Sequence, residues 1–278
     1  MKDIWDGVVP LSFNLEDYEY IPDRLALNKL QKMQELQVIT RDYIREFAEP
    51  YINGQLNGTG VKISRRQLPK FNQLIERVAA ILHIVPPQVF IRNDPFLNAL
   101  TFGTGEQNVI VISHSLYEQL NDCQMAFILG HEMGHIKSQH VLYANMYSYL
   151  QNRQRRFSPT LQEAILDWER KSEVTADRAG LIACQDINQA CRSLLVLAAG
   201  SITLANEVDI EEYLESQLLS LDFNPVGQKA ETLYSHHYIP VRMRQLLDFY
   251  YSEQFRRLWP EQGDWPDINS LELEIELK

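Results

Sequence analysis

Apolar residues recur every three or four positions over most of the 278-residue chain, which is the spacing of one face of a helix. This pattern predicts a mainly helical protein. The helices expected from it cover about residues 25–47, 64–82, 121–142, 160–184, 187–204, 208–221 and 239–257.

A second pattern, rich in β-branched and aromatic residues, interrupts the helices in one region. It predicts strands at 61–63, 89–91, 99–103 and 108–113, the last two joined by a glycine-containing turn. These strands lie directly before the helix expected at 121. The fold class that follows is α+β, mainly helical, with a small sheet beside that helix.

The remaining segments suggest one domain with an extension at each end. Residues 51–60 hold several glycines and asparagines and are expected to form a loop. We expect an N-terminal extension and helix over 1–60 that packs on the body, a single domain over 61–257, and a tail over 258–278. Residues 1–23 either pack on the body or cover its cleft, and the alternating residues 271–278 either form a strand or are disordered.

Residues 131–135 read His-Glu-Met-Gly-His on the helix expected at 121. His131 and His135 are four residues apart, so their imidazoles emerge from the same face and can hold one zinc ion. Glu132 lies about 100° round the helix, near enough to take a proton from a water activated by the metal. Gly134 inside this helix costs about 1 kcal/mol relative to alanine, and a close neighbour such as a strand or a substrate backbone would explain that cost.

A hydrolytic zinc site needs a third protein ligand and one open position. Glu173 is the candidate, on the helix expected at 160–184. Asp177 lies one turn further on the same face, where its carboxylate can accept a hydrogen bond from a ligand histidine and fix the tautomer of that ring.

Together these motifs resemble the HtpX-like and CAAX-prenyl-protease-1-like zinc metallopeptidases, whose third ligand lies in an E-x-x-A-D element on a second helix. Here that element is Glu173 to Asp177. The resemblance covers roughly residues 60–250. It implies a zincin-like fold, one zinc ion held by His131, His135 and Glu173, and a peptide or unfolded-protein substrate.

The resemblance also implies further site residues. His236, six residues before Arg242, is similar to the family's H-P-x-x-x-x-R element, but His237 stands where the family has proline, so both histidines stay candidates. Arg242 would orient this histidine or contact substrate. The strand that includes Asn98, Ala99 and Leu100 resembles the family's edge strand, which would hold substrate as an added strand.

Composition limits the classes of function. A hydrophobic fraction of 45% and a charged fraction of 23% are typical of a globular protein. A net charge of −11 argues against a nucleic-acid partner. The longest uncharged run, 193–206, is too short to span a bilayer, which leaves peripheral membrane contact open. Three cysteines and no signal peptide suggest the cytoplasm.

We therefore predict a zinc-dependent endopeptidase in which Glu132 is the general base and His236 with Arg242 assists. Two other functions stay open. One is a scaffold or chaperone-like module that keeps zinc without turnover. The other is a zinc amidohydrolase acting on a non-peptide amide, for which Cys123 would be the alternative third ligand.

Overall fold

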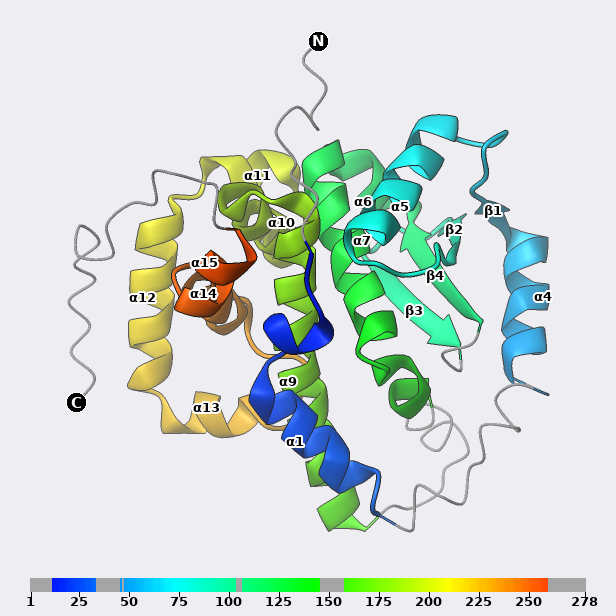
Figure 1. Cartoon of the computed structure of the whole chain (residues 1–278). Helices are drawn as coiled ribbons and strands as arrows, with labels where there is room; N and C mark the ends of the chain where they lie inside the picture. The colour runs from blue at the N-terminus through cyan, green and yellow to red at the C-terminus, as the bar shows by residue number, and fades with distance from the viewer. Residues whose placement is uncertain (1–11, 34–45, 47, 104–106, 146–157, 260–278) are drawn as a thin grey trace.

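The computed structural model describes residues 12–33, 46, 48–103, 107–145 and 158–259. These residues form an α+β fold, mainly helical with one small sheet, which confirms the predicted fold class. In Figure 1 two long helices, α7 (Asp122–Lys137) and α9 (Pro159–Cys184), stand side by side at the centre, with the sheet on one side of the pair and most of the C-terminal helices on the other.

The sheet has four strands in the spatial order β1-β2-β4-β3. They are β1 (Gly60–Lys62), β2 (Gln88–Arg92), β3 (Ala99–Gly103) and β4 (Asn108–Ser113). β2 and β4 run parallel, while β1 and β3 each pair antiparallel with their neighbour. Among the described strands β3 is an edge strand, and it contacts α7.

The helices of the N-terminal half surround the sheet and the two central helices. They are α1 (Ile21–Leu30), α4 (Glu49–Thr59), α5 (Pro69–Ile81) and α6 (His114–Gln119), with the 3₁₀ turn η1 (Leu15–Asp17) before α1. α1 packs along α9, and its Leu30 shares an apolar cluster with Trp168 of α9. The N-terminal region thus lies against one of the two helices that carry the predicted site.

The C-terminal half is entirely helical within the described residues. It contains α10 (Ile187–Ala199), α11 (Ile202–Glu207), α12 (Ile210–Asp222), α13 (Pro225–Glu231), α14 (Ile239–Tyr250) and α15 (Glu253–Leu258). α14 packs against α9 and α10. None of the helices in the described part of the chain has the length and apolarity needed to cross a membrane.

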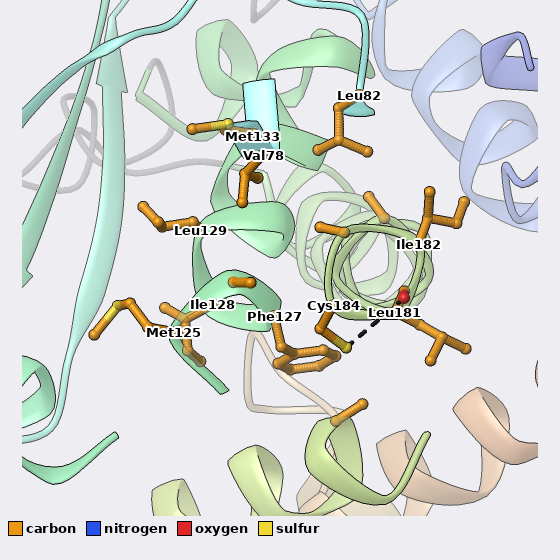
Figure 2. Close-up of a cluster of buried hydrophobic side chains, with 14 of the residues drawn as sticks. Val78, Leu82, Met125, Phe127, Ile128, Leu129, Met133, Leu181, Ile182 and Cys184 are labelled. Atoms are coloured by element: carbon orange, nitrogen blue, oxygen red, sulfur yellow. Dashed lines mark hydrogen bonds between the residues drawn. The ribbon is translucent and has the colours of Figure 1, made fainter. Parts of the chain in front are cut away.

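Buried apolar side chains on both sides of α7 hold the central helices in place. Figure 2 shows Leu129 and Met125 on the side of α7 that faces the sheet, while Phe127 lies beside Cys184 of α9. Phe127 and Leu129 are fully buried. Because burying an apolar side chain of this size stabilises a fold by about 1.5–3 kcal/mol, this core fixes the position of α7 firmly against both neighbours.

Small residues let α7 and α9 approach each other closely. A Cβ atom added at Gly130 would lie 2.4 Å from Cβ of Ala183, and one at Gly134 would lie 2.6 Å from Cβ of Ala179. No side chain fits at these distances without a shift of the helices. The close neighbour of Gly134 is therefore the helix α9 and not the expected strand or substrate backbone. The short interhelical distance brings side chains of both helices to one point.

We expect Gly130→Ala to lower the free energy of unfolding by about 1–3 kcal/mol, the usual cost of overpacking a core. This outcome is opposite to the gain of about 1 kcal/mol that alanine normally brings inside a helix. Gly54→Ala is the matched control, because Gly54 lies in the exposed helix α4 with open space around its Cα. Urea unfolding of the three proteins checks this, and a Gly130→Ala protein as stable as Gly54→Ala would contradict the close packing.

Several element boundaries differ from the predictions. Of the expected loop at 51–60, residues 51–59 belong to helix α4 and Gly60 begins β1. α5 begins at Pro69 rather than at Ser64, which instead pairs with Gln67 in a turn. The helices expected at 187–204 and 239–257 are each divided in two. Of the helix expected at 25–47, α1 covers residues up to Leu30, and residues 34–45 lie outside the described residues, as does the strand predicted at 271–278.

The largest difference concerns the end of the motif helix. α7 ends at Lys137 instead of continuing through Leu142, and Gln139 adopts a left-handed conformation with φ of 60°. A new helical segment begins at His140. This turn redirects the chain, so that His140 faces back toward the motif.

Candidate metal centre

The motif histidines emerge where α7 passes α9. Asn121 caps α7 in a reciprocal capping box with Gln124, which fixes where the helix begins and therefore which face His131 and His135 share. His131 is 8% exposed, and His135 is only partly exposed. The two imidazoles project into a cavity of about 600 Å³ between β3, α7, α9 and the segment before α14.

Glu173 of α9 meets both imidazoles. Nε2 of His131 lies 3.2 Å from Nε2 of His135. The Glu173 carboxyl oxygens lie 3.5 Å from the first of these nitrogens and 3.3 Å from the second. Oε2 of Glu173 is buried and has no hydrogen-bond partner. One nitrogen from each histidine and one oxygen from Glu173 thus face a common point, as a shared cation requires.

Asp177, one turn beyond Glu173, fixes the orientation of His131. Its Oδ1 lies 2.9 Å from Nδ1 of His131, which leaves Nε2 of that ring for the metal. Arg242 of α14 donates two hydrogen bonds to the same carboxylate, at 2.9 and 2.7 Å. Burial alone would raise the pKa of Asp177, but the charge of Arg242 lowers it.

Arg242 contacts Glu173 and Asp177 and not His236, the histidine before α14. Besides Asp177, its guanidinium lies 3.4 Å from Oε2 of Glu173, and it is 6% exposed. Burial would raise the pKa of Glu173, but its electrostatic interactions with His236, His131 and Arg242 hold the pKa well below the usual range. The partner that the structure gives Arg242 therefore differs from His236, the partner expected from the sequence.

Replacing Arg242 with methionine should lower the stability of the metal-free protein by about 3–5 kcal/mol, because two buried carboxyl groups lose their cation. Arg244→Met on the same helix is the control. Arg244 pairs with Asp248 at the surface, so its loss should cost less than about 1 kcal/mol. Urea unfolding in the presence of a chelator measures both, and equal effects would contradict a supporting ion pair at Arg242.

Glu132 lies beside the triad and is held by the edge strand. Oε2 of Glu132 accepts a hydrogen bond of 2.6 Å from the Thr101 hydroxyl of β3. Glu132 is 6% exposed and lines the cavity. Thr101 was not among the residues selected from the sequence, because only the fold brings β3 next to α7.

His236 and His237 have different partners. Nε2 of His236 lies 3.6 Å from Oε1 of Glu173, and its side chain is 58% exposed. Nδ1 of His237 lies 3.1 Å from Oε1 of Glu231. Both line the cavity, but His236 is the one beside the predicted ligands, which favours it as the site histidine.

The edge strand forms one wall of the cavity. Asn98, Ala99, Leu100 and Thr101 all line it. β3 pairs with β4 on one side, and among the described strands none pairs with its other side. This geometry is compatible with the predicted addition of a substrate strand at that edge.

Two further cavity residues escaped the sequence analysis. Glu169, one turn before Glu173, has a buried Oε2 without a partner, and burial together with the charge of Glu173 raises its pKa to about 7. His140 also lines the cavity, with Nδ1 3.0 Å from Nδ1 of His135. A four-residue spacing could have indicated Glu169, whereas the turn that redirects His140 has no clear sequence signal.

The site combines a helix that bears His-Glu-x-x-His, a carboxylate from a second helix and an edge strand beside them. This combination is typical of a metallopeptidase. The family model for peptidase family M48 matches residues 65–249, and the chain belongs to that family. This confirms the predicted resemblance to HtpX-like metallopeptidases and the assignment as a metalloprotease.

Relatives with described names agree with this family. The plastoglobule-localized metallopeptidase 48 of Arabidopsis thaliana is 29% identical over 270 residues, which cover 91% of this chain and 78% of that protein. HtpX protease homologues match shorter regions. The one from Moorella thermoacetica is 30% identical over 32% of this chain and 30% of its own length, and one from Streptococcus pyogenes is 33% identical over 28% and 26%. No solved structure matches the chain.

Proposed function

We propose that this chain is a zinc-dependent endopeptidase in which His131, His135 and Glu173 hold the metal. The observation that carries this proposal is the spacing of the three donor groups. The two Nε2 atoms lie 3.2 Å apart, Oε1 of Glu173 lies 3.3 Å from Nε2 of His135, and Oε2 of Glu173 lies 3.5 Å from Nε2 of His131. Atoms at tetrahedral positions about 2.0–2.2 Å from a zinc ion lie about 3.3–3.6 Å apart. Oε2 of Glu173 also accepts no hydrogen bond, although Arg242 lies 3.4 Å away, so this buried oxygen keeps a lone pair that can bind a metal ion.

When bound, zinc would supply a Lewis acid that makes a water acidic and polarises the scissile carbonyl. Glu132 takes the proton of that water and delivers it to the leaving amine. The Thr101 hydroxyl on its Oε2 holds the carboxylate toward the cavity. This assigns Glu132 as the general acid and base.

His236 is the donor that faces the developing negative charge on the carbonyl oxygen. It is more than half exposed and lies beside Glu173 at the cavity wall, so that it can reach a substrate without leaving a buried site. A donor at such a position contributes about 2.7–4 kcal/mol to lowering a barrier of this kind. Ser235 contacts Nδ1 of the ring at 2.7 Å and orients it.

The substrate is an extended peptide or an unfolded protein segment. β3 offers main-chain groups at its outer edge, and an added strand would place its amide bonds over the cavity between Ala99 and Thr101. Binding by main-chain hydrogen bonds requires an unstructured stretch of chain. The absence of a nucleic-acid partner and the cytoplasmic location stay predictions from composition.

The amidohydrolase alternative finds less support. It requires Cys123 as third ligand, yet Cys123 lies in the first turn of α7 and its thiol faces the carbonyl of Cys184 at 3.6 Å. Glu173 is the residue that faces both imidazoles, which supports it as the third ligand. The scaffold alternative gives Glu132 no role. A purely structural zinc ion needs no general base, yet the Glu132 carboxylate is held beside the proposed ligands by the Thr101 hydroxyl.

Digestion of a peptide library by the purified full chain tests the proposal. We expect internal cleavage that a chelator abolishes and added zinc restores. Cleavage that persists in the chelator would contradict a metal mechanism. A zinc-loaded protein that cleaves nothing would favour the scaffold.

A further inference from the structure

The two histidines of the metal centre are supported in different ways. Nδ1 of His131 contacts a carboxylate directly, that of Asp177. Nδ1 of His135 instead lies 3.0 Å from Nδ1 of a second imidazole, His140. One of these two nitrogens must carry a proton for a hydrogen bond to form, and which one carries it decides whether Nε2 of His135 is free for a metal.

The other nitrogen of His140 faces a carboxyl group from the N-terminal helix. Nε2 of His140 lies 3.0 Å from Oδ2 of Asp23, although the ring N–H does not point straight at that oxygen. Asp23 is fully buried and His140 is 2% exposed. Burying a carboxyl group costs free energy unless hydrogen-bond donors surround it. The groups around Asp23 therefore indicate its role.

Two side chains of α9 hold Asp23 in place. The Trp168 indole donates to Oδ1 at 3.1 Å, and the Thr175 hydroxyl donates to Oδ2 at 2.6 Å. The backbone N–H of Tyr20 donates to the same hydroxyl oxygen at 3.2 Å, which directs the Thr175 proton toward Asp23. Asp23 therefore accepts from both neighbours, and the group that His140 presents to it must be a donor.

These contacts determine the tautomers. With its proton on Nε2, facing Asp23, a neutral His140 has a lone pair on Nδ1. Nδ1–H of His135 donates a hydrogen bond to that lone pair. Nε2 of His135 then carries no proton, and its lone pair faces the ligand atoms of His131 and Glu173. The order of groups is thus Asp23, His140, His135 and metal.

We propose that Asp23 and His140 are positioning residues that fix the tautomer and orientation of His135. Asp23 belongs to α1, and His140 to the segment after the break at Gln139. α1 lies outside the residues 65–249 that the family model matches, so a segment outside the shared domain completes the metal centre. This inference rests on the proposed zinc site.

Zinc affinity, measured by competition with a chelator on the full chain, tests the inference. Asp23→Asn replaces an acceptor by a donor with little change in shape, and His140→Phe keeps a ring without nitrogens. Each should weaken zinc binding about 10–100-fold, the range for residues that orient a ligand. Both residues act through His135, so the losses of the two variants should not add. The zinc affinity of the double variant should lie within about twofold of that of the weaker-binding single variant.

Leu30→Ala is the matched control on α1. Leu30 is 1% exposed, packs in the Trp168 cluster and lies two turns beyond Asp23 on α1, so its truncation should lower the melting temperature of the metal-free protein and leave zinc affinity unchanged. Zinc affinities of Asp23→Asn and His140→Phe within twofold of the unaltered chain, or losses that add in the double variant, would overturn the inference. An unaltered chain that binds no zinc would overturn the proposed function as well.

Discussion

Glu132→Gln should lower kcat/KM for peptide cleavage by about 10²–10⁴-fold, because glutamine cannot accept the proton that general-base catalysis requires. The amide can still accept the Thr101 hydrogen bond, so the fold around the site should not change. Zinc content should also stay at one ion per chain. Peptidase assays and metal analysis on the same preparation measure both quantities.

Glu118→Gln is the control for this substitution. Glu118 lies exposed on α6, so this substitution makes the same chemical change away from the cavity. Peptidase activity should therefore be unaltered. Peptidase activity of Glu132→Gln that equals the activity of the control would remove Glu132 from the mechanism.

Glu173→Ala should abolish zinc binding at micromolar metal, with a loss of affinity beyond the roughly 10–100-fold typical of residues that only orient a ligand. The substitution removes a charged ligand from a three-residue site and leaves two imidazoles. Cys123→Ser should bind zinc normally, because its thiol faces Cys184 and not the cavity. Equilibrium dialysis against zinc gives all the affinities.

Glu163→Ala controls for changes to α9 itself. Glu163 is exposed on the same helix, two to three turns before Glu173. Zinc binding retained in Glu173→Ala and lost in Cys123→Ser would reverse the ligand assignment and favour the amidohydrolase.

The sequence predicts the parts of the site that depend on local geometry. Positions 131 and 135, and likewise 173 and 177, share a helix face by their spacing alone, and the structure brings both pairs together. The family resemblance of the two motifs further supported Glu173 as the third ligand. Gly134 further signalled the close contact with a neighbour that lets two helices supply one site.

Contacts between distant segments could not be read in the same way. Asp23 meets Trp168 across 145 positions, and Thr101 meets Glu132 across 31, so neither pairing leaves a periodic trace. Arg242 was recognised by its motif, but only the packing of α14 on α9 gives it Asp177 as partner.

Local signals also misled at two places. Residues 51–60 have the glycine and asparagine content of a loop, yet residues 51–59 belong to α4, whose buried Leu56 packs with Phe90 of the sheet. Tertiary packing outweighs intrinsic propensity there. At the end of α7, the helical periodicity of the sequence continues past Lys137, although the chain turns at Gln139. The contact of His140 with His135 depends on this turn and could not be predicted from the periodicity.

Anomalous diffraction at the zinc absorption edge, from crystals grown with zinc, tests the central claim most directly. We expect one strong peak about 2.0–2.2 Å from Nε2 of His131, Nε2 of His135 and a carboxylate oxygen of Glu173. A peak bound by other side chains, or a Glu173 carboxylate turned away from a peak at the two histidines, would contradict it.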